Sequence, residues 1–251
     1  MTARLLPAAF AASLALAAPA GAFDVSAMSD AEREAFRAEV RAYLLENPEV
    51  IMEAVAVLED REAAAQAAAD AELVETYAEE IFDDGYSWVG GNPDGDVTLV
   101  EFIDYRCSYC RRAHDEVNDL VESDGNIRLV IKEFPILGPD SLASSRFAVA
   151  VKQVAGDDAY HLAKEALIEM TGEANETTLS RLAETLGLDA DEILVQMQSD
   201  EVTAELAETR ALAQRLGING TPTFVLPDRM LRGYVPLDGM REIVADVRGE
   251  G

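Results

Sequence analysis

The apolar residues between positions 29 and 84 recur every three or four residues. Ile51, Val55 and Leu58 show this spacing, which places side chains on one face of an α-helix. Seven of the ten residues from 62 to 71 are alanine, which favours a helix but offers little side-chain volume to bury. The pattern predicts a helical region with a narrow apolar stripe. Three interpretations of this region are open: a helical hairpin packed on the main domain, a solvated linker, or an oligomerisation arm. We favour the oligomerisation arm.

The ends of two helices can be predicted within this region. Ser29 is followed three residues later by Glu32, the pattern of a capping box, and the helix that starts there should run to about Glu46. Asn47 and Pro48 then mark the start of a second, long helix, because proline is favoured at the first helical position.

The pattern changes after residues 85–96, whose Gly, Asn, Pro and Asp content predicts a boundary. Residues 97–104 form a nearly continuous β-branched and aromatic run, typical of a strand buried on both faces. Further strands are predicted at residues 127–134, 223–226 and 231–235, and a last helix from about residue 237. The long connection before residue 221 is predicted to hold helices at residues 141–155, 159–170, 178–186, 190–197 and 202–216.

The first residues have the features of a secretory signal. Arg4 supplies a positive start, residues 5–18 are apolar, and residues 20–22 are small, as at a cleavage site. The alternative is a membrane anchor, which is disfavoured because the run is short and is broken by Pro7 and Pro19. We therefore predict a cleavable signal peptide and export to the periplasm. The predicted regions are a signal peptide at 1–22, a helical region at 23–85, and a domain at 86–251 with a helical insertion at about 139–216.

Composition excludes one class of partner. The chain has 251 residues, with 20 Lys and Arg against 48 Asp and Glu, and a formal net charge of −28. Nucleic-acid binding needs clustered basic residues, so no nucleic-acid partner is expected. Beyond the signal segment, no apolar run is long enough to cross a membrane, which predicts a soluble globular body.

The chain has only two cysteines, Cys107 and Cys110, and they form one Cys-x-x-Cys motif between a predicted strand and helix. At a helix N-terminus, free backbone N–H groups and the helix dipole favour the thiolate of the first cysteine. Arg106 and Arg111 flank the pair and are predicted to stabilise this thiolate further, although they could instead solvate a helix face.

Other uses of two cysteines are less well supported. A structural disulfide closing so short a loop would add little stability. Zinc usually takes four ligands, and His114 and His161 are the only histidines. Cu(I) could bind two thiolates alone, so a copper-binding dithiol protein remains an alternative of another class. No metal site is predicted.

Three stretches in the right order resemble the DsbA family of thiol oxidoreductases. They are Val100–Cys110, Lys132–Pro139 and Gly220–Phe224. In addition, residues 47–51 look like part of the N-terminal domain of its ScsC-like branch. The resemblance implies an α/β, thioredoxin-like fold with a helical insertion, preceded by an α-helical N-terminal region. It also implies no cofactor other than a redox-active disulfide between Cys107 and Cys110.

The resemblance also implies roles for individual residues. Cys107 would be the attacking nucleophile, the more exposed of the two, and Cys110 the buried resolving thiol. Pro222 matches the cis-proline of the family, and Thr221 before it would present its backbone to a substrate strand. From the residues alone, an ordinary trans peptide bond is the expectation at Pro222.

One acidic residue and the two residues between the cysteines bear on the activity. Glu101 matches the family's carboxyl group that moves protons for the resolving cysteine; from sequence alone it could equally pair with Lys132. The most oxidising family members often carry histidine between the cysteines, whereas this chain has Ser108 and Tyr109. A less oxidising potential is therefore expected.

These observations predict a periplasmic thiol:disulfide oxidoreductase of protein substrates that are unfolded or wrongly bridged. An isomerase or reductase is the first expectation, and a DsbA-like dithiol oxidase is the alternative. An isomerase needs a membrane-bound redox partner that keeps Cys107 reduced. It also needs several active sites around one substrate, which predicts a homo-oligomer through residues 23–85, as in the trimers of some ScsC-like proteins.

Overall fold

The computed structural model describes residues 27–249, so the predicted signal peptide at 1–22 lies outside the described residues. The chain divides into two compact units, and the boundary in the sequence falls between Glu59 and Asp60. Each unit is described by itself. None of the helices within residues 27–249 combines the length and the apolar character that crossing a membrane requires.

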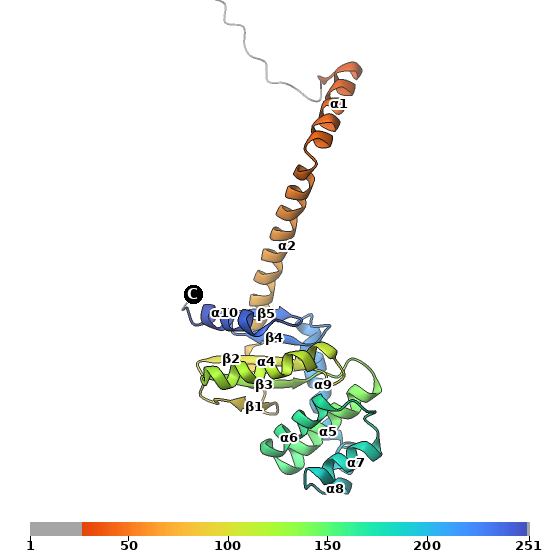
Figure 1. Ribbon diagram of the computed structural model, residues 1–251, viewed down its shortest axis with the longest axis vertical. Helices are drawn as coiled ribbons and strands as arrows, with labels where there is room; N and C mark the ends of the chain where they lie inside the picture. Colours follow the sequence, from red (N-terminus) through yellow and green to blue (C-terminus); the bar gives the residue numbers. More distant parts are fainter. Residues whose placement is uncertain (1–26, 250–251) are drawn as a thin grey trace, which may run out of the picture. The chain divides into compact units, whose positions relative to one another are not determined.

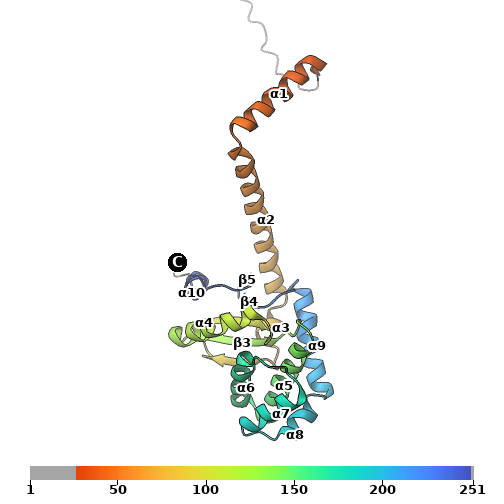
Figure 2. The same cartoon turned by 45° about the vertical axis from the view of Figure 1, so that its right-hand side comes forward.

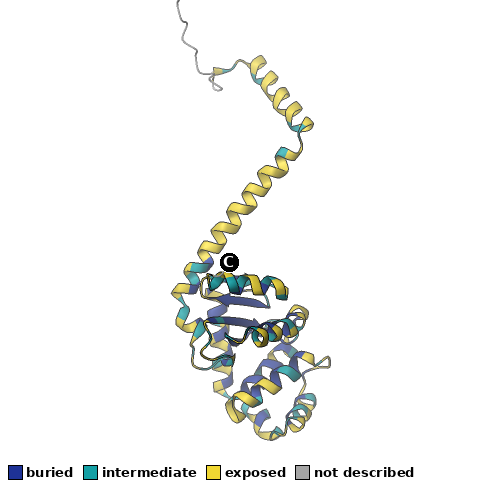
Figure 3. Ribbon diagram, turned by 60° about the vertical axis from the view of Figure 1, so that its left-hand side comes forward, coloured by how far each residue is buried: buried dark blue, intermediate teal, exposed yellow. Residues whose placement is uncertain are grey.

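The described part of the first unit consists of α1 (Asp30–Glu46) and the beginning of α2 (Glu49–Thr76). The predicted capping box is confirmed: the Ser29 side chain accepts from the Glu32 backbone N–H, and the Glu32 carboxylate accepts from the Ser29 N–H at 2.8 Å. Every residue of α1 is exposed or half-buried, and Figure 3 shows this helix almost entirely in the colour of exposed residues. Its apolar side chains are therefore uncovered in this chain.

The described strands of the second unit form one five-stranded sheet, in the order β1-β3-β2-β4-β5. Strands β2 and β3 are parallel and connected through α4, and the other neighbours are antiparallel. The strands are β1 (Trp88–Gly91), β2 (Val97–Ile103), β3 (Ile127–Glu133), β4 (Thr223–Leu226) and β5 (Arg229–Arg232). The thioredoxin-like fold predicted from the sequence is confirmed.

Strand β1 was not predicted. It lies within residues 85–96, where the glycine-rich composition indicated only a boundary. Two of its four residues are Gly90 and Gly91, and it pairs only with β3, at the edge of the sheet. Glycine is unfavourable in strands, so pairing with an already formed neighbour, rather than local propensity, accounts for this strand.

The helices predicted for the long connection are confirmed with small shifts of their ends, and Figures 1 and 2 show the insertion helices α5 to α8 grouped beside the sheet. The remaining helices are α3 (Ala78–Phe82), α4 (Ser108–Asp124), α5 (Pro139–Ala155), α6 (Asp157–Glu169), α7 (Glu176–Thr185), α8 (Ala190–Gln196), α9 (Asp200–Arg215) and α10 (Leu237–Val247).

The register of β2 and β3 determines which residues face each side of the sheet. Glu101 lies opposite Ile131, and Phe102 lies opposite Lys132. Because side chains alternate along a strand, Glu101 points to one face and Lys132 to the other. The Glu101 face is covered by α4 and α10, and the Lys132 face by α3, α9 and the end of α2.

Asp104 fixes the loop between β2 and α4. This fully buried carboxylate accepts from the backbone N–H groups of Arg106 at 2.8 Å, Ile136 at 2.8 Å and Leu137 at 3.1 Å. It therefore joins the loop after β2 to the loop after β3. Both loops lie at the carboxyl ends of the parallel strands, where α/β sheets usually carry their sites.

Candidate active site

The two cysteines lie where β2 ends and α4 begins. Cys107 is the N-cap residue of α4 and 7% exposed, whereas Cys110 lies in the first turn and is fully buried. In its protonated form, the thiol of Cys107 donates a hydrogen bond to the backbone oxygen of Thr221 at 3.1 Å. The peptide bond between Thr221 and Pro222 is cis, as the family resemblance implies. Residues 114 positions apart in the sequence thus meet at this helix end.

The surroundings of the two thiols shift their pKa values in opposite directions. Hydrogen bonding with the Cys110 thiol, with Thr221 and with the backbone N–H groups of Cys110 and Tyr109 lowers the pKa of Cys107 to about 5. Burial acts in the opposite direction. The neighbouring Cys107 sulfur, burial and the Glu101 charge raise the pKa of Cys110. One thiol is therefore ionised at neutral pH, and the other keeps its proton.

Glu101 is buried on β2, and its charge acts on the Cys110 thiol. Burial raises its pKa to about 7, Lys164 and His114 act in the opposite direction, and Cys107 adds to the rise. A carboxyl group that titrates near neutral pH can take up and release a proton during turnover. The geometry thus suits the role that the family resemblance implies for Glu101.

The alternative pairing of Glu101 with Lys132 is wrong. Lys132 donates to the backbone oxygen of Glu80 at 2.8 Å and forms an ion pair with Asp84. The physical reason is the strand register, which sends Glu101 and Lys132 to opposite faces of the sheet.

The two flanking arginines hold a neighbouring loop. Arg106 and Arg111 both donate to the backbone oxygen of Met170, at 3.0 and 2.6 Å, and Arg111 also donates to the Tyr105 oxygen at 3.0 Å. They therefore connect the start of α4 to the end of α6. Their thiolate-stabilising role stays a prediction.

Three residues near the site were not predicted to act there: His114, Lys164 and Glu165. The carboxylate of Glu165 lies 2.7 Å from His114 Nε2 and 2.8 Å from Lys164 Nζ. His114 could have been found, because it follows Cys110 by four residues and so lies on the same helix face. Lys164 and Glu165 come from the insertion and give no local signal.

The structure offers no metal site in its described part. Within residues 27–249, no three His, Cys, Asp or Glu side chains gather so that they could hold a metal ion. The chemistry available at this helix end is that of one acidic thiol, one buried thiol and one buried carboxyl group.

Comparison with known proteins agrees with this arrangement. The family described as "Thioredoxin" matches residues 82–246, about two thirds of the chain. The chain belongs to the thioredoxin family. The "Copper resistance protein ScsC N-terminal domain" matches residues 32–65 of this thioredoxin-family protein. The predicted resemblance to DsbA-like proteins and their ScsC-like branch is thereby confirmed.

Several solved structures resemble this thioredoxin-family chain. A thioredoxin-like oxidoreductase from Silicibacter pomeroyi DSS-3 is 45% identical, covers 69% of this chain and 98% of its own, and has a TM-score of 0.63. BcfH from Salmonella enterica Typhimurium is 25% identical, covers 88% and 97%, and has a TM-score of 0.71. A Proteus mirabilis ScsC variant is 23% identical, covers 91% and 100%, and has a TM-score of 0.67. The similarity to the Silicibacter pomeroyi protein supports an oxidoreductase, and the similarity to the ScsC variant shows the fold alone.

Curated relatives include much longer proteins. A Na(+)/H(+) antiporter NhaA 1 from Salinispora arenicola is 29% identical over 157 residues, which is 62% of this chain. The chain spans about a quarter of the length of the curated relatives it matches.

The acidity of Cys107 leads to a pH prediction. Its alkylation by iodoacetamide should accelerate as the pH rises through about 5 and level off by pH 7, because the thiolate is the nucleophile. Mass spectrometry should locate the label on Cys107, and Cys107→Ser should take up almost none at pH 7. A midpoint near the ordinary thiol value of about 8.5 would contradict the assigned environment.

Proposed function

We propose that this chain is a periplasmic thiol:disulfide oxidoreductase that exchanges disulfides with unfolded or wrongly bridged proteins. The observation that carries the proposal is the pairing of an acidic Cys107, which is 7% exposed, with a fully buried Cys110 of raised pKa. The apolar segment at residues 1–22 supports export. The Thr221 backbone, in contact with the Cys107 sulfur, supports substrate docking at the loop before β4.

The proposed reaction has two exchange steps. The Cys107 thiolate attacks a substrate disulfide, forms a mixed disulfide and releases one substrate thiolate, which takes a proton from solvent. Cys110 then transfers its proton to the Glu101 carboxylate and attacks the Cys107 sulfur. This step releases the second substrate thiolate and forms the Cys107–Cys110 disulfide. A membrane-bound redox partner would return the two electrons.

Within this class we favour isomerase or reductase activity over dithiol oxidation. Ser108 and Tyr109 lie between the cysteines, and the thiolate therefore lacks the histidine donor of the most oxidising relatives. A less stabilised thiolate lowers the oxidising power of the pair.

The first unit supports oligomerisation. Phe36, Val40 and Leu44 follow one another at helical spacing on α1 and, with Leu45 and Ile51, line a groove of about 420 Å³. An exposed apolar stripe of this kind is unfavourable in water and indicates an interface. We therefore propose that copies of the chain associate, as a trimer or another homo-oligomer, through the helical region at 23–85.

The test combines association with activity. In Phe36→Asp/Val40→Asp, light scattering should show a monomer, because the charges make burial of the stripe unfavourable. Reactivation of a scrambled disulfide substrate should fall severalfold, while reduction of a small disulfide should be retained. The matched control Glu34→Ala/Glu39→Ala changes exposed polar positions of the same helix. A wild-type monomer that oxidises dithiols without unscrambling would contradict the isomerase proposal and favour the oxidase.

The match to a copper resistance protein's N-terminal domain favours Cu(I) binding as a second candidate function. A two-thiolate site needs both sulfurs deprotonated, and the raised pKa of Cys110 opposes this. Stoichiometric Cu(I) that blocks alkylation of Cys107 would nevertheless favour this function.

A further inference from the structure

One carboxylate on the mostly exposed helix α2 is buried. Asp70 is 3% exposed, and it lies in the part of α2 that belongs to the second unit. Its Oδ1 atom accepts from Arg232 Nη2 at 2.7 Å and from Gln66 Nε2 at 2.7 Å. A buried carboxylate is costly unless it is paired, and Arg232 supplies the opposite charge. The pair therefore ties the end of α2 to the last residue of β5.

Arg232 uses its remaining donor capacity on the segment that leads to the cis-proline. Its Nη1 donates to the Gly217 backbone oxygen at 2.9 Å, and its Nη2 lies 3.3 Å from the Leu216 oxygen. Leu216 is the C-cap residue of α9, where a helix leaves carbonyl groups without intrahelical partners. A planar guanidinium can serve several acceptors at once. Arg232 thus fixes the start of the loop at residues 217–222, which we call the cis-proline loop.

The other end of the cis-proline loop is fixed by the backbone of β5. Arg232 pairs with Thr223 in the register of β4 and β5. The N–H of the next residue, Gly233, donates to the Pro222 oxygen at 2.9 Å. Between the two ends lies Thr221, whose backbone oxygen contacts the nucleophilic sulfur at 3.1 Å. One arginine therefore contacts the start of this loop and belongs to the strand that holds its end.

The cis-proline loop leaves open space beside Arg232. A pocket of about 240 Å³ is lined by residues 219–223, Arg232 and Gly233. The loop also contains Gly217 and Gly220, and glycine leaves the backbone free to adopt other conformations. On this side, hydrogen bonds hold the loop where side-chain packing does not.

We propose that Arg232 is a positioning residue for exchange with protein substrates: it holds the cis-proline loop in the place where a substrate strand docks, and Asp70 of α2 orients its guanidinium group. The inference rests on the proposed thiol:disulfide exchange and deepens it. It gives the end of α2 a part in substrate binding. Because the listed contacts of Arg232 and Asp70 do not include the reacting sulfurs, their effect falls on docking rather than on the attack by Cys107.

The experiment compares two substrates of the full chain, with glutathione as the reductant. One is an extended peptide that carries a disulfide and pairs its backbone with Thr221. The other is a small chromogenic disulfide, which offers no strand to dock. In Asp70→Ala, KM for the peptide should rise roughly fivefold, about the effect of one lost hydrogen bond, with kcat retained. Turnover of the small disulfide should stay at the wild-type level.

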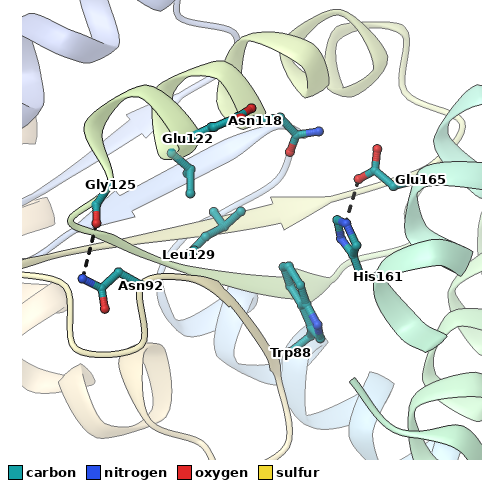
Figure 4. Close-up of a pocket in the computed structure, with 10 residues that line it drawn as sticks. Trp88, Asn92, Asn118, Glu122, Gly125, Leu129, His161 and Glu165 are labelled. Atoms are coloured by element: carbon teal, nitrogen blue, oxygen red, sulfur yellow. Dashed lines mark hydrogen bonds and ion pairs between the residues drawn. The ribbon is translucent and has the colours of Figure 1, made fainter. Parts of the chain in front are cut away.

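The matched control is Asp124→Ala. It removes a carboxylate from Arg248, also at 2.7 Å, and both side chains of this pair are largely buried. Asp124 is the last residue of α4, at the opposite end of the helix from Cys107, and it precedes Gly125 beside the pocket in Figure 4. This variant should keep the wild-type KM for the peptide. If Asp70→Ala does not fold, Asp70→Asn replaces it, because its amide oxygen can still accept from Arg232.

A second comparison separates positioning from general structural support. In the Arg232→Met background the guanidinium group is gone, so adding Asp70→Ala should raise KM for the peptide no further. An unchanged peptide KM in both single variants, an equal rise in Asp124→Ala, or an equal loss on the small disulfide would overturn the inference while the exchange activity stands. A wild-type chain that turns over neither disulfide would instead overturn the proposed function.

Discussion

Cys107→Ser should reduce disulfide exchange to the uncatalysed background, a loss on the order of a thousandfold or more. A serine hydroxyl at the N-terminus of α4 stays protonated at neutral pH and cannot form a disulfide. The measurement is reduction of a small chromogenic disulfide together with reactivation of a scrambled protein. Because Cys110 is fully buried behind Cys107, it cannot replace the missing nucleophile.

Cys110→Ser should behave differently, and this difference tests the assigned order of attack. The first step still proceeds, so mixed disulfides between Cys107 and substrate proteins should accumulate and run as high-mass bands on non-reducing gels. Ser108→Ala alters the neighbouring helix position and serves as the control that resolves normally. Substrate attached to Cys110 in Cys107→Ser would reverse the assigned roles.

Asp84→Asn should destabilise the fold by about 3–5 kcal/mol, because it leaves the buried Lys132 ammonium without its charge partner. Lys132 is fully buried on the sheet face opposite the cysteines, and its remaining contacts are the Glu80 oxygen at 2.8 Å and the ring of Tyr86. Chemical denaturation monitored by circular dichroism gives the free energy of unfolding.

The matched control for this change is Asp157→Asn. It removes the partner of Lys152 from a more exposed pair at 3.7 Å, for which a loss of about 0–1 kcal/mol is expected. The double variant Asp84→Asn/Lys132→Met should recover most of the stability, because no buried charge remains. Equal losses in Asp84→Asn and Asp157→Asn would show that burial does not govern the strength of the pair.

The parts of the site that were predictable are those carried by short local patterns. Cys107 and Cys110 form a motif at a strand-to-helix junction, and Thr221-Pro222 precedes a recognisable strand. Their meeting across 114 residues followed from the family resemblance, because no local spacing specifies it. The capping box at Ser29 was predictable for the same reason: its partner is three residues away.

The parts that were not predictable depend on contacts between distant segments. Strand β1 forms where β3 offers it an edge, although its own residues include two glycines. Glu165 of α6 contacts His114 on the cysteine helix at 2.7 Å, although more than fifty residues separate it from the cysteines in the sequence. The pairing of Lys132 with Asp84 depends on strand register, which the sequence of either strand alone does not specify.

That register has a consequence for how the chain selects its native sheet. If β3 slipped by one residue against β2, Lys132 would turn toward the face of α4 and Cys110, and it would lose Asp84. A slip of β2 instead would bury the Glu101 carboxyl among Val74, Leu212 and Val225 on the other face, away from Lys164. Either error would place an ionisable side chain among apolar residues without its native charged neighbours, so both alternative registers are disfavoured.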